Sequence, residues 1–94
     1  MFDIETGADG TIFLIGRFDA SQVGKATPVF ESISEGGIVD FARLDYISSA
    51  GLGLLLAAQK RLSKRGTGLR VVHLNPHIRN VFHYSGFDHI FQID

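Results

Sequence analysis

The sequence contains no cysteine and no tryptophan, and only two of its 94 residues are proline. Without cysteine, the chain forms no disulfide, offers no thiolate to a metal ion and has no cysteine nucleophile. The same absence is typical of intracellular proteins. The chain is instead rich in apolar residues, which make up 45% of it and include eight phenylalanines. At this length, the composition predicts one small domain, residues 1–94, built around a single core.

An excess of charge and a long apolar run are also missing. The formal net charge of −1 gives no general electrostatic reason to bind nucleic acid or an anionic membrane. The longest uninterrupted apolar run, residues 54–58, is far too short to span a bilayer. The acidic, alternating start of the chain differs from the basic and then apolar start of a secretory signal. We therefore expect a soluble cytoplasmic domain with no nucleic-acid partner and no membrane insertion.

Strand-like and helix-like segments alternate along the chain. Strand patterns cover residues 2–6, 11–16, 37–42, 68–73 and 88–93, and helical spacing covers residues 20–34, 49–65 and 76–85. The first two strands are expected to form a hairpin, and the second is apolar enough to be covered on both faces. Ser21 and Asn75 are candidate N-caps, and the basic residues near 60–65 complement the dipole of the second helix. The order β-β-α-β-α-β-α-β predicts an α/β domain with helices packed on a mixed β-sheet.

The most specific pattern lies in the middle of the chain. Residues 44–53 read LDYISSAGLG, and they resemble the central motif of the STAS family, the sulfate transporter and anti-sigma factor antagonist domains. Residues 16–19 (GRFD) resemble the G-x-L-D element of the same family, and Asn75-Pro76 resembles its late N/S-P element. Phe82 and the turn at residues 85–87 resemble its ending. The resemblance spans essentially the whole chain and implies a single STAS domain with the STAS-like fold.

This resemblance implies a regulator rather than an enzyme, with no catalytic residue and no cofactor. Single-domain bacterial members are anti-anti-sigma factors. Unphosphorylated, they bind an anti-sigma factor that is also a serine-protein kinase with a histidine-kinase-like ATPase fold. The kinase phosphorylates a serine of the motif, and a PP2C-type phosphatase removes the phosphate. Carried over to this chain, the acceptor is Ser49. Ser48 stands where many members have Asp, and Ala50 stands where many have a second Ser or Thr.

The residues expected at the partner surface surround this serine. They are Asp19, Ser48, Ser49, Ala50, Gly51, Leu52, Gly53 and Leu54. Ser49 is expected at or next to the N-cap of a helix, where free N–H groups and the helix dipole suit a phosphate. Each glycine costs up to about 1 kcal/mol of helix propensity, which indicates bare backbone near a partner or a neighbouring strand. Leu54 is expected to lie off the core stripe and to be exposed for binding.

Other interpretations of these residues stay open. Ser48 and Ser49 can be helix caps alone, and Asp19 can be an ordinary turn residue. The glycine patterns are incomplete as nucleotide loops, no G-x-S-x-G surrounds Ser49, and the four histidines lack zinc spacing, so we expect no metal site. Two alternative functions remain. One is a STAS accessory subunit of an ABC-type lipid or solute transport complex, and the other is a non-enzymatic sensor or scaffold domain of a signalling assembly.

Overall fold

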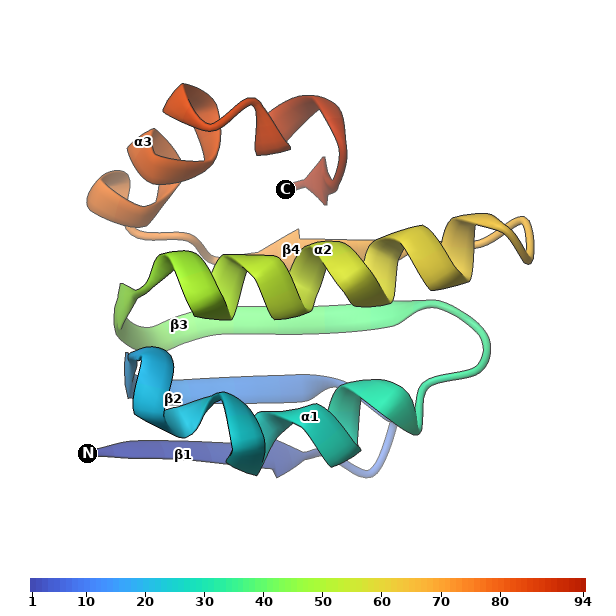
Figure 1. Cartoon of the computed structure of the whole chain (residues 1–94), viewed down its shortest axis with the longest axis horizontal. Helices are drawn as coiled ribbons and strands as arrows, with labels where there is room; N and C mark the ends of the chain where they lie inside the picture. Colours follow the sequence, from blue (N-terminus) through green and yellow to red (C-terminus); the bar gives the residue numbers. More distant parts are fainter.

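The computed structural model describes all 94 residues and contains five strands and three α-helices (Figure 1). The elements are β1 (Phe2–Thr6), β2 (Ile12–Phe18), α1 (Val23–Glu31), β3 (Gly37–Ile47), α2 (Ser49–Ser63), β4 (Leu69–Val72), α3 (Pro76–Tyr84) and β5 (Gln92–Ile93). Two short 3-10 turns, η1 (Ala20–Gln22) and η2 (Phe87–His89), precede α1 and β5. The predicted order of strands and helices is confirmed. No helix combines the length and the apolar character that crossing a membrane requires.

All five strands belong to one sheet, and they lie in it in chain order, β1-β2-β3-β4-β5. The predicted hairpin is confirmed, since β1 pairs with β2 antiparallel, while the remaining pairs are parallel. Successive parallel strands that advance in one direction, joined by right-handed crossovers, place every connecting helix on the same face. Figure 1 shows α1 and α2 side by side in front of the sheet.

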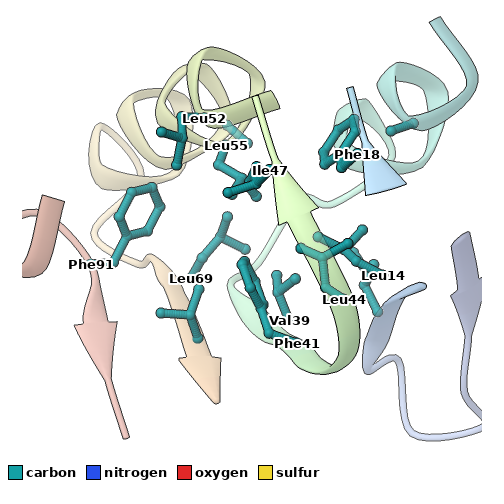
Figure 2. Packing of buried hydrophobic residues seen from close by; sticks show 14 of the residues in the cluster. Leu14, Phe18, Val39, Phe41, Leu44, Ile47, Leu52, Leu55, Leu69 and Phe91 are labelled. Carbon is teal, nitrogen blue, oxygen red and sulfur yellow. The ribbon is translucent and has the colours of Figure 1, made fainter. Parts of the chain in front are cut away.

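The core lies between this face and the helices (Figure 2). Along β2, Ile12, Leu14 and Phe18 are buried, whereas Phe13 and Ile15 between them are only half-buried. This alternation shows that helices cover one face of the strand and leave the other face open to solvent. The prediction that β2 is covered on both faces is therefore wrong, because all three helices pack on the same side of the sheet.

Two polar side chains in the second half of α2 bind this helix to the rest of the molecule. The Arg61 guanidinium donates to the carbonyl oxygens of Phe30 and Ile33, each at 2.7 Å. Gln59 Oε1 accepts from the Leu69 amide at 2.7 Å, and its Nε2 donates to the Ile90 carbonyl at 3.0 Å. Arg61 thus adds donors to carbonyl oxygens at and after the end of α1, in addition to any effect on the dipole of its own helix.

Candidate functional site

β2, β3 and β4 run parallel, and each leads into a helical element at its carboxyl end. The ends of β2 and β3 lie side by side because Phe18 pairs with Ile47, whereas β4 ends opposite Asp40, well before the end of β3. A polar side chain caps each of these helical starts. The capping bonds are Asp19 to the Ser21 amide (3.0 Å), Ser48 to the Gly51 amide (3.1 Å) and Asn75 to the Ile78 amide (2.8 Å). The predicted Asn75 cap is confirmed. The predicted Ser21 cap is wrong, since Ser21 donates to the true cap, Asp19.

Ser48 is the N-cap of α2, and its polar groups are all engaged. Its amide donates to the Phe18 carbonyl at 2.9 Å, and its hydroxyl accepts from the Gly51 amide. Its carbonyl accepts from the Leu52 amide at 2.9 Å. Ser48 therefore joins the ends of β2 and β3 to the first turn of α2, and its hydroxyl has a structural role.

Ser49, the next residue, is the first residue of α2, as expected for a position at or next to the cap. Its side chain is exposed, and its hydroxyl makes no hydrogen bond within the chain. Because Ser48 takes the amides of Gly51 and Leu52, the amides of Ser49 and Ala50 are the ones left without an acceptor. The free hydroxyl therefore lies beside free N–H donors at the positive end of a 15-residue helix.

The two glycines of the motif differ in their surroundings. A Cβ on Gly51 would lie 3.1 Å from side-chain atoms of both Phe18 and Ile47, so the close approach of the strand ends explains this glycine. A Cβ on Gly53 would have no heavy atom within 4 Å. Gly53 is exposed, and it presents bare backbone to solvent.

Three of the predicted contact residues are not freely exposed. Gly51 and Leu52 are buried, and their contact with a partner stays a prediction. Leu54 is half-buried and packs against the core, so the expectation of a freely exposed side chain is wrong. The helix turns by about 100° per residue, so Leu54 stands near the edge of the buried face rather than opposite it.

From Ser49 to Ala57 the exposed residues of α2 are small and uncharged, whereas Lys60 is exposed in the last turn. Ser49, Gly53 and Ala57 are exposed at successive spacings of four, and Ala50 is exposed beside them. We call these four residues the α2 stripe. Our sequence interpretation missed Ala57, although its spacing from Ser49 and Gly53 was a usable signal. Because the stripe has no charge and no long side chain, another protein could approach the helix backbone closely along it.

Asp19 lies at the same edge as the serines. Phe18 and Ile47 are paired across β2 and β3, so the residues that follow them, Asp19 and Ser48, leave the sheet side by side. The hydrogen bonds from the Ser21 hydroxyl and amide lower the pKa of the half-buried Asp19 carboxyl, which is therefore ionised at neutral pH. The site combines one carboxylate, one free hydroxyl and a free helix start.

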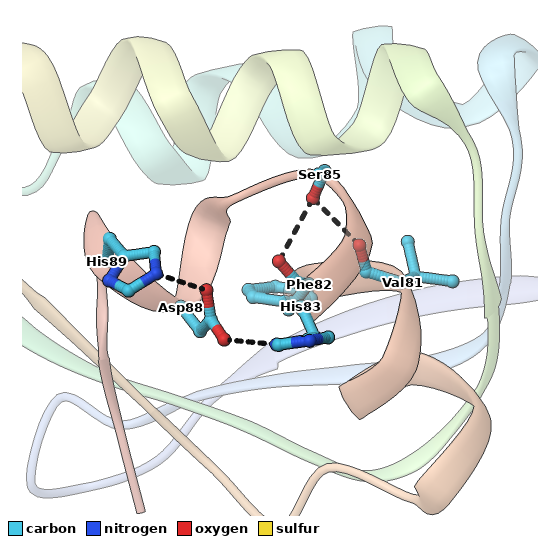
Figure 3. A network of polar contacts seen from close by, with 6 residues as sticks. All are labelled: Val81, Phe82, His83, Ser85, Asp88 and His89. Carbon is cyan, nitrogen blue, oxygen red and sulfur yellow. Dashed lines mark hydrogen bonds and ion pairs between the residues drawn. The ribbon is translucent and has the colours of Figure 1, made fainter.

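A second polar cluster joins α3 to η2 (Figure 3). His83 Nδ1 lies 2.9 Å from Asp88 Oδ2, and this hydrogen bond is the main cause of the lowered pKa of Asp88. Asp88 Oδ1 makes no hydrogen bond and lies 3.7 Å from His89 Nε2. No group of three or more His, Cys, Asp or Glu side chains in the structure is arranged to hold a metal ion. The cluster therefore links α3 to η2. Unlike the start of α2, it contains no free hydroxyl, because the Ser85 hydroxyl is hydrogen-bonded within the helix.

Comparison with known proteins supports the assignment of the central motif to the STAS family. The sequence profile described as "Mlab, STAS domain" matches residues 4–92. BtrV of Bordetella bronchiseptica, whose name gives it as a proposed anti-sigma factor antagonist, is 46% identical over 56 residues. That match covers 60% of this chain and 48% of BtrV, about half of the relative's length. The anti-sigma-B factor antagonist of Listeria monocytogenes is 29% identical over 86 residues, 87% of this chain and 75% of the relative.

The fold has a solved counterpart. The Bacillus cell fate determinant SpoIIAA in its phosphorylated form superposes with a TM-score of 0.70 at 22% identity. The match covers 100% of this chain and 91% of SpoIIAA. This likeness shows a shared fold, a mixed sheet covered by helices on one face.

Proposed function

This chain belongs to the STAS domain family, and on that premise we propose that it is an anti-sigma factor antagonist controlled by phosphorylation of Ser49. Its partner in this proposal is an anti-sigma factor, which is also the serine-protein kinase that modifies it. A PP2C-type phosphatase restores the binding form. The proposal draws support from the two relatives named as antagonists and from the free Ser49 hydroxyl at the start of α2.

The observation that carries the proposal is the difference between two adjacent serines. The Ser48 hydroxyl is engaged in capping α2, and a phosphate there would break the cap. The Ser49 hydroxyl is exposed and has no partner, so a kinase can reach it without disturbing the fold. A phosphate on Ser49 would meet the free amides and the positive dipole end of α2, where anions are favoured. This geometry supports Ser49 as the acceptor in preference to Ser48.

The effect of the phosphate is local and electrostatic. A phosphoserine adds a charge of roughly −1.5 to −2 at neutral pH. The α2 stripe is uncharged, and the ionised Asp19 stands at the same edge. A partner seated on the stripe would have to desolvate the phosphate beside a second negative group. A loss of about 3 kcal/mol would weaken the complex roughly a hundredfold without any refolding of the domain.

In this proposal the domain itself performs no chemistry. No hydrogen bond joins the Ser49 hydroxyl to a base, and the segment from Ile47 to Leu56 contains no histidine, lysine or carboxylate. In this proposal Ser49 is a substrate for another enzyme and part of a docking surface, and its exposed position at the start of α2 supports both roles. Robust turnover of a nucleotide or an ester by the pure protein, abolished by Ser49→Ala, would contradict a purely regulatory role.

The partner is identified by capture from the native cell. Tagged wild-type protein and Ser49→Asp are compared, and the proteins retained are determined by mass spectrometry. We expect an ATPase of the histidine-kinase-like class with the wild type and much less of it with Ser49→Asp. Retention of ABC transporter subunits in its place would favour an accessory role in a transport complex.

Incubation with the captured kinase and ATP, followed by peptide mapping, should place the phosphate on Ser49, and a phosphate on Ser48 would contradict the proposal.

Affinity measurements on substituted proteins test the charge effect. Ser49→Asp should weaken binding of the purified partner at least tenfold, while Ser49→Ala should bind as the wild type does, since it removes no bond within the chain. Ser34→Asp is a matched control because Ser34 is exposed in the loop between α1 and β3, at the opposite end of the molecule from the start of α2 (Figure 1). Equal weakening by both aspartates would mean that total charge, and not the place of the charge, decides binding.

A further inference from the structure

The face of the sheet that the helices leave open has its own hollow, with a volume of about 590 Å³. The apolar side chains of its floor are Phe13, Ile38 and Val72, with Asp40 standing between Phe13 and Val72, and its rim includes Asp9 and His73. Phe13, Asp40 and Val72 are register partners across β2, β3 and β4, so their side chains stand in one row on the same face. We call this region the open-face hollow. It lies on the opposite side of the sheet from α2.

Its apolar floor is only partly covered. Ile38 is 36% exposed, one of four large apolar side chains on the molecule that are plainly exposed. Phe13 and Val72 beside it are half-buried, although they belong to strands at the centre of the sheet. Central strands whose apolar side chains remain accessible on one face present area that a partner can cover.

The charge of the hollow has one sign. Three aspartates and one histidine line it, and neither lysine nor arginine does. The hydrogen bond from the Thr11 amide lowers the pKa of Asp9, which is therefore ionised. The third aspartate, Asp94, is paired with Arg70 at 2.7 Å. The carboxylates of Asp9 and Asp40 are therefore the two that have no arginine or lysine partner. Positive charge is therefore the complement of this surface.

The rim is also held in a defined shape. His73 is the only non-glycine residue with a positive φ, +61°, a conformation that is uncommon outside glycine and that Asn, Asp and His adopt more often than other residues. In this conformation its Nδ1 lies 3.0 Å from Asp40 Oδ2, while Asp40 Oδ1 accepts from the Ala42 amide at 2.8 Å. Strained backbone that fixes the direction of a side chain is characteristic of recognition sites. The Asp40 carboxylate is thus oriented before any partner arrives.

We infer that the open-face hollow is a second docking surface, and that its occupant is a basic, extended segment of a partner protein with an arginine next to an apolar residue. A guanidinium is planar and stacks on an aromatic ring while it binds carboxylates, which suits Phe13 with Asp9 and Asp40 around it. The chain's own Arg43 guanidinium lies 5.8 Å from the Phe13 ring centre and is paired with Glu5 at 3.4 Å, so a partner's guanidinium would share this ring with Arg43. The apolar neighbour would cover Ile38 and Val72. Three aspartates disfavour a nucleic acid or an anionic membrane as the occupant.

This inference does not rest on the proposed role of Ser49. The hollow and the α2 stripe lie on opposite sides of the sheet, so a protein bound at one need not displace a protein bound at the other. A chain with two such surfaces could hold one partner continuously on the sheet and release a second from α2. Phosphorylation would then change one contact while the other persists.

A direct test uses a fluorescein-labelled octapeptide of alternating arginine and leucine, with fluorescence anisotropy as the readout. The matched peptide carries glutamate in place of arginine. We expect the arginine peptide to bind at least tenfold more tightly than the glutamate peptide, with amide chemical shift changes centred on Phe13, Ile38 and Val72. Failure of the arginine peptide to bind at millimolar concentration would overturn the inference, as would shift changes centred on α2.

Two substitutions locate the site. Ile38→Lys puts a positive charge into the hollow at an exposed position and should weaken the arginine peptide at least tenfold. Ala57→Lys makes the same charge change on the exposed side of α2 and should leave the affinity unchanged. Val72→Lys is the second variant at the hollow, and a circular dichroism melt confirms that each variant is folded. Equal peptide affinity in Ile38→Lys and Ala57→Lys would overturn the inference. Ser49→Asp should leave peptide binding unchanged, and this result would show that the open-face hollow acts independently of the proposed function of Ser49.

Discussion

The two ends of α2 present opposite chemistry on one helix. At its start, residues 48–54 contain no charge, and Ser49 and Gly53 are exposed without partners. Toward its end, Gln59 and Arg61 make four hydrogen bonds to main-chain groups of distant segments. The start of the helix is therefore accessible to another molecule, whereas its end is hydrogen-bonded to other segments of the same chain.

The difference indicates how a small domain can hold a binding surface in place. Arg61 and Gln59 fix the helix against α1, β4 and the segment before β5, and Ser48 fixes its first turn to the strand ends. With its direction set in this way, α2 can leave its first exposed residues without internal contacts and still present them in one position. Preorganisation of this kind lowers the entropy that a partner must remove on binding.

The largest effect is expected at the bound end of the helix. Arg61→Ala removes two charge-assisted hydrogen bonds at 2.7 Å and leaves the carbonyls of Phe30 and Ile33 without these donors. The free energy of unfolding should fall by about 3 kcal/mol, as measured by urea denaturation. Lys60→Ala, an exposed neighbour that makes no such bond, should change it by less than about 0.5 kcal/mol. Similar values for the two would show that the Arg61 bonds contribute little.

The next effect concerns the glycine at the buried side of the free end. Gly51→Ala places a methyl group 3.1 Å from Phe18 and Ile47, which are held in the core. Overpacking of this kind costs about 1–3 kcal/mol and exceeds the gain of up to about 1 kcal/mol in helix propensity. We expect a loss of about 1 kcal/mol in thermal or urea unfolding. A stabilised Gly51→Ala would mean that the strand ends can move away from α2.

The adjacent serines provide the sharpest internal contrast. Ser48→Ala should lower the free energy of unfolding by about 1 kcal/mol because it removes the cap of α2. Ser49→Ala should change it by less than about 0.5 kcal/mol because its hydroxyl has no partner in the chain. Both are measured by urea denaturation under the same conditions. If Ser48→Ala and Ser49→Ala lower the free energy of unfolding equally, Ser48 is not the cap of α2 in the sense proposed, and the two serines do not have separate roles.

The effect on stability expected at Gly53 has the opposite sign. Gly53→Ala adds a methyl group in open space, so it should stabilise the helix by up to about 1 kcal/mol. If a partner approaches the bare backbone here, the same substitution should weaken partner binding even though the fold becomes more stable. Calorimetry of both properties checks this, and unchanged affinity would remove Gly53 from the docking surface.

Local sequence signals were sufficient for much of this protein. Periodicity and turn residues predicted the order of all strands and helices, the hairpin, and the Asn75 cap that starts α3. The residues after β3 indicated both a helix start and the place of Ser49 beside the cap. These features depend on interactions within a few residues, namely capping bonds, side-chain spacing and the conformations that glycine and proline allow.

The tertiary structure decided what depends on distant neighbours. The apolar β2 looked covered on both faces, but only the strand order shows that every helix lies on one side and that Phe13 remains accessible. Leu54 is half-buried because the core reaches around α2, and Arg61 meets carbonyls that lie about thirty residues away in the chain. Such contacts arise because parallel strands bring remote segments together, and no local pattern in the sequence records which segments these will be.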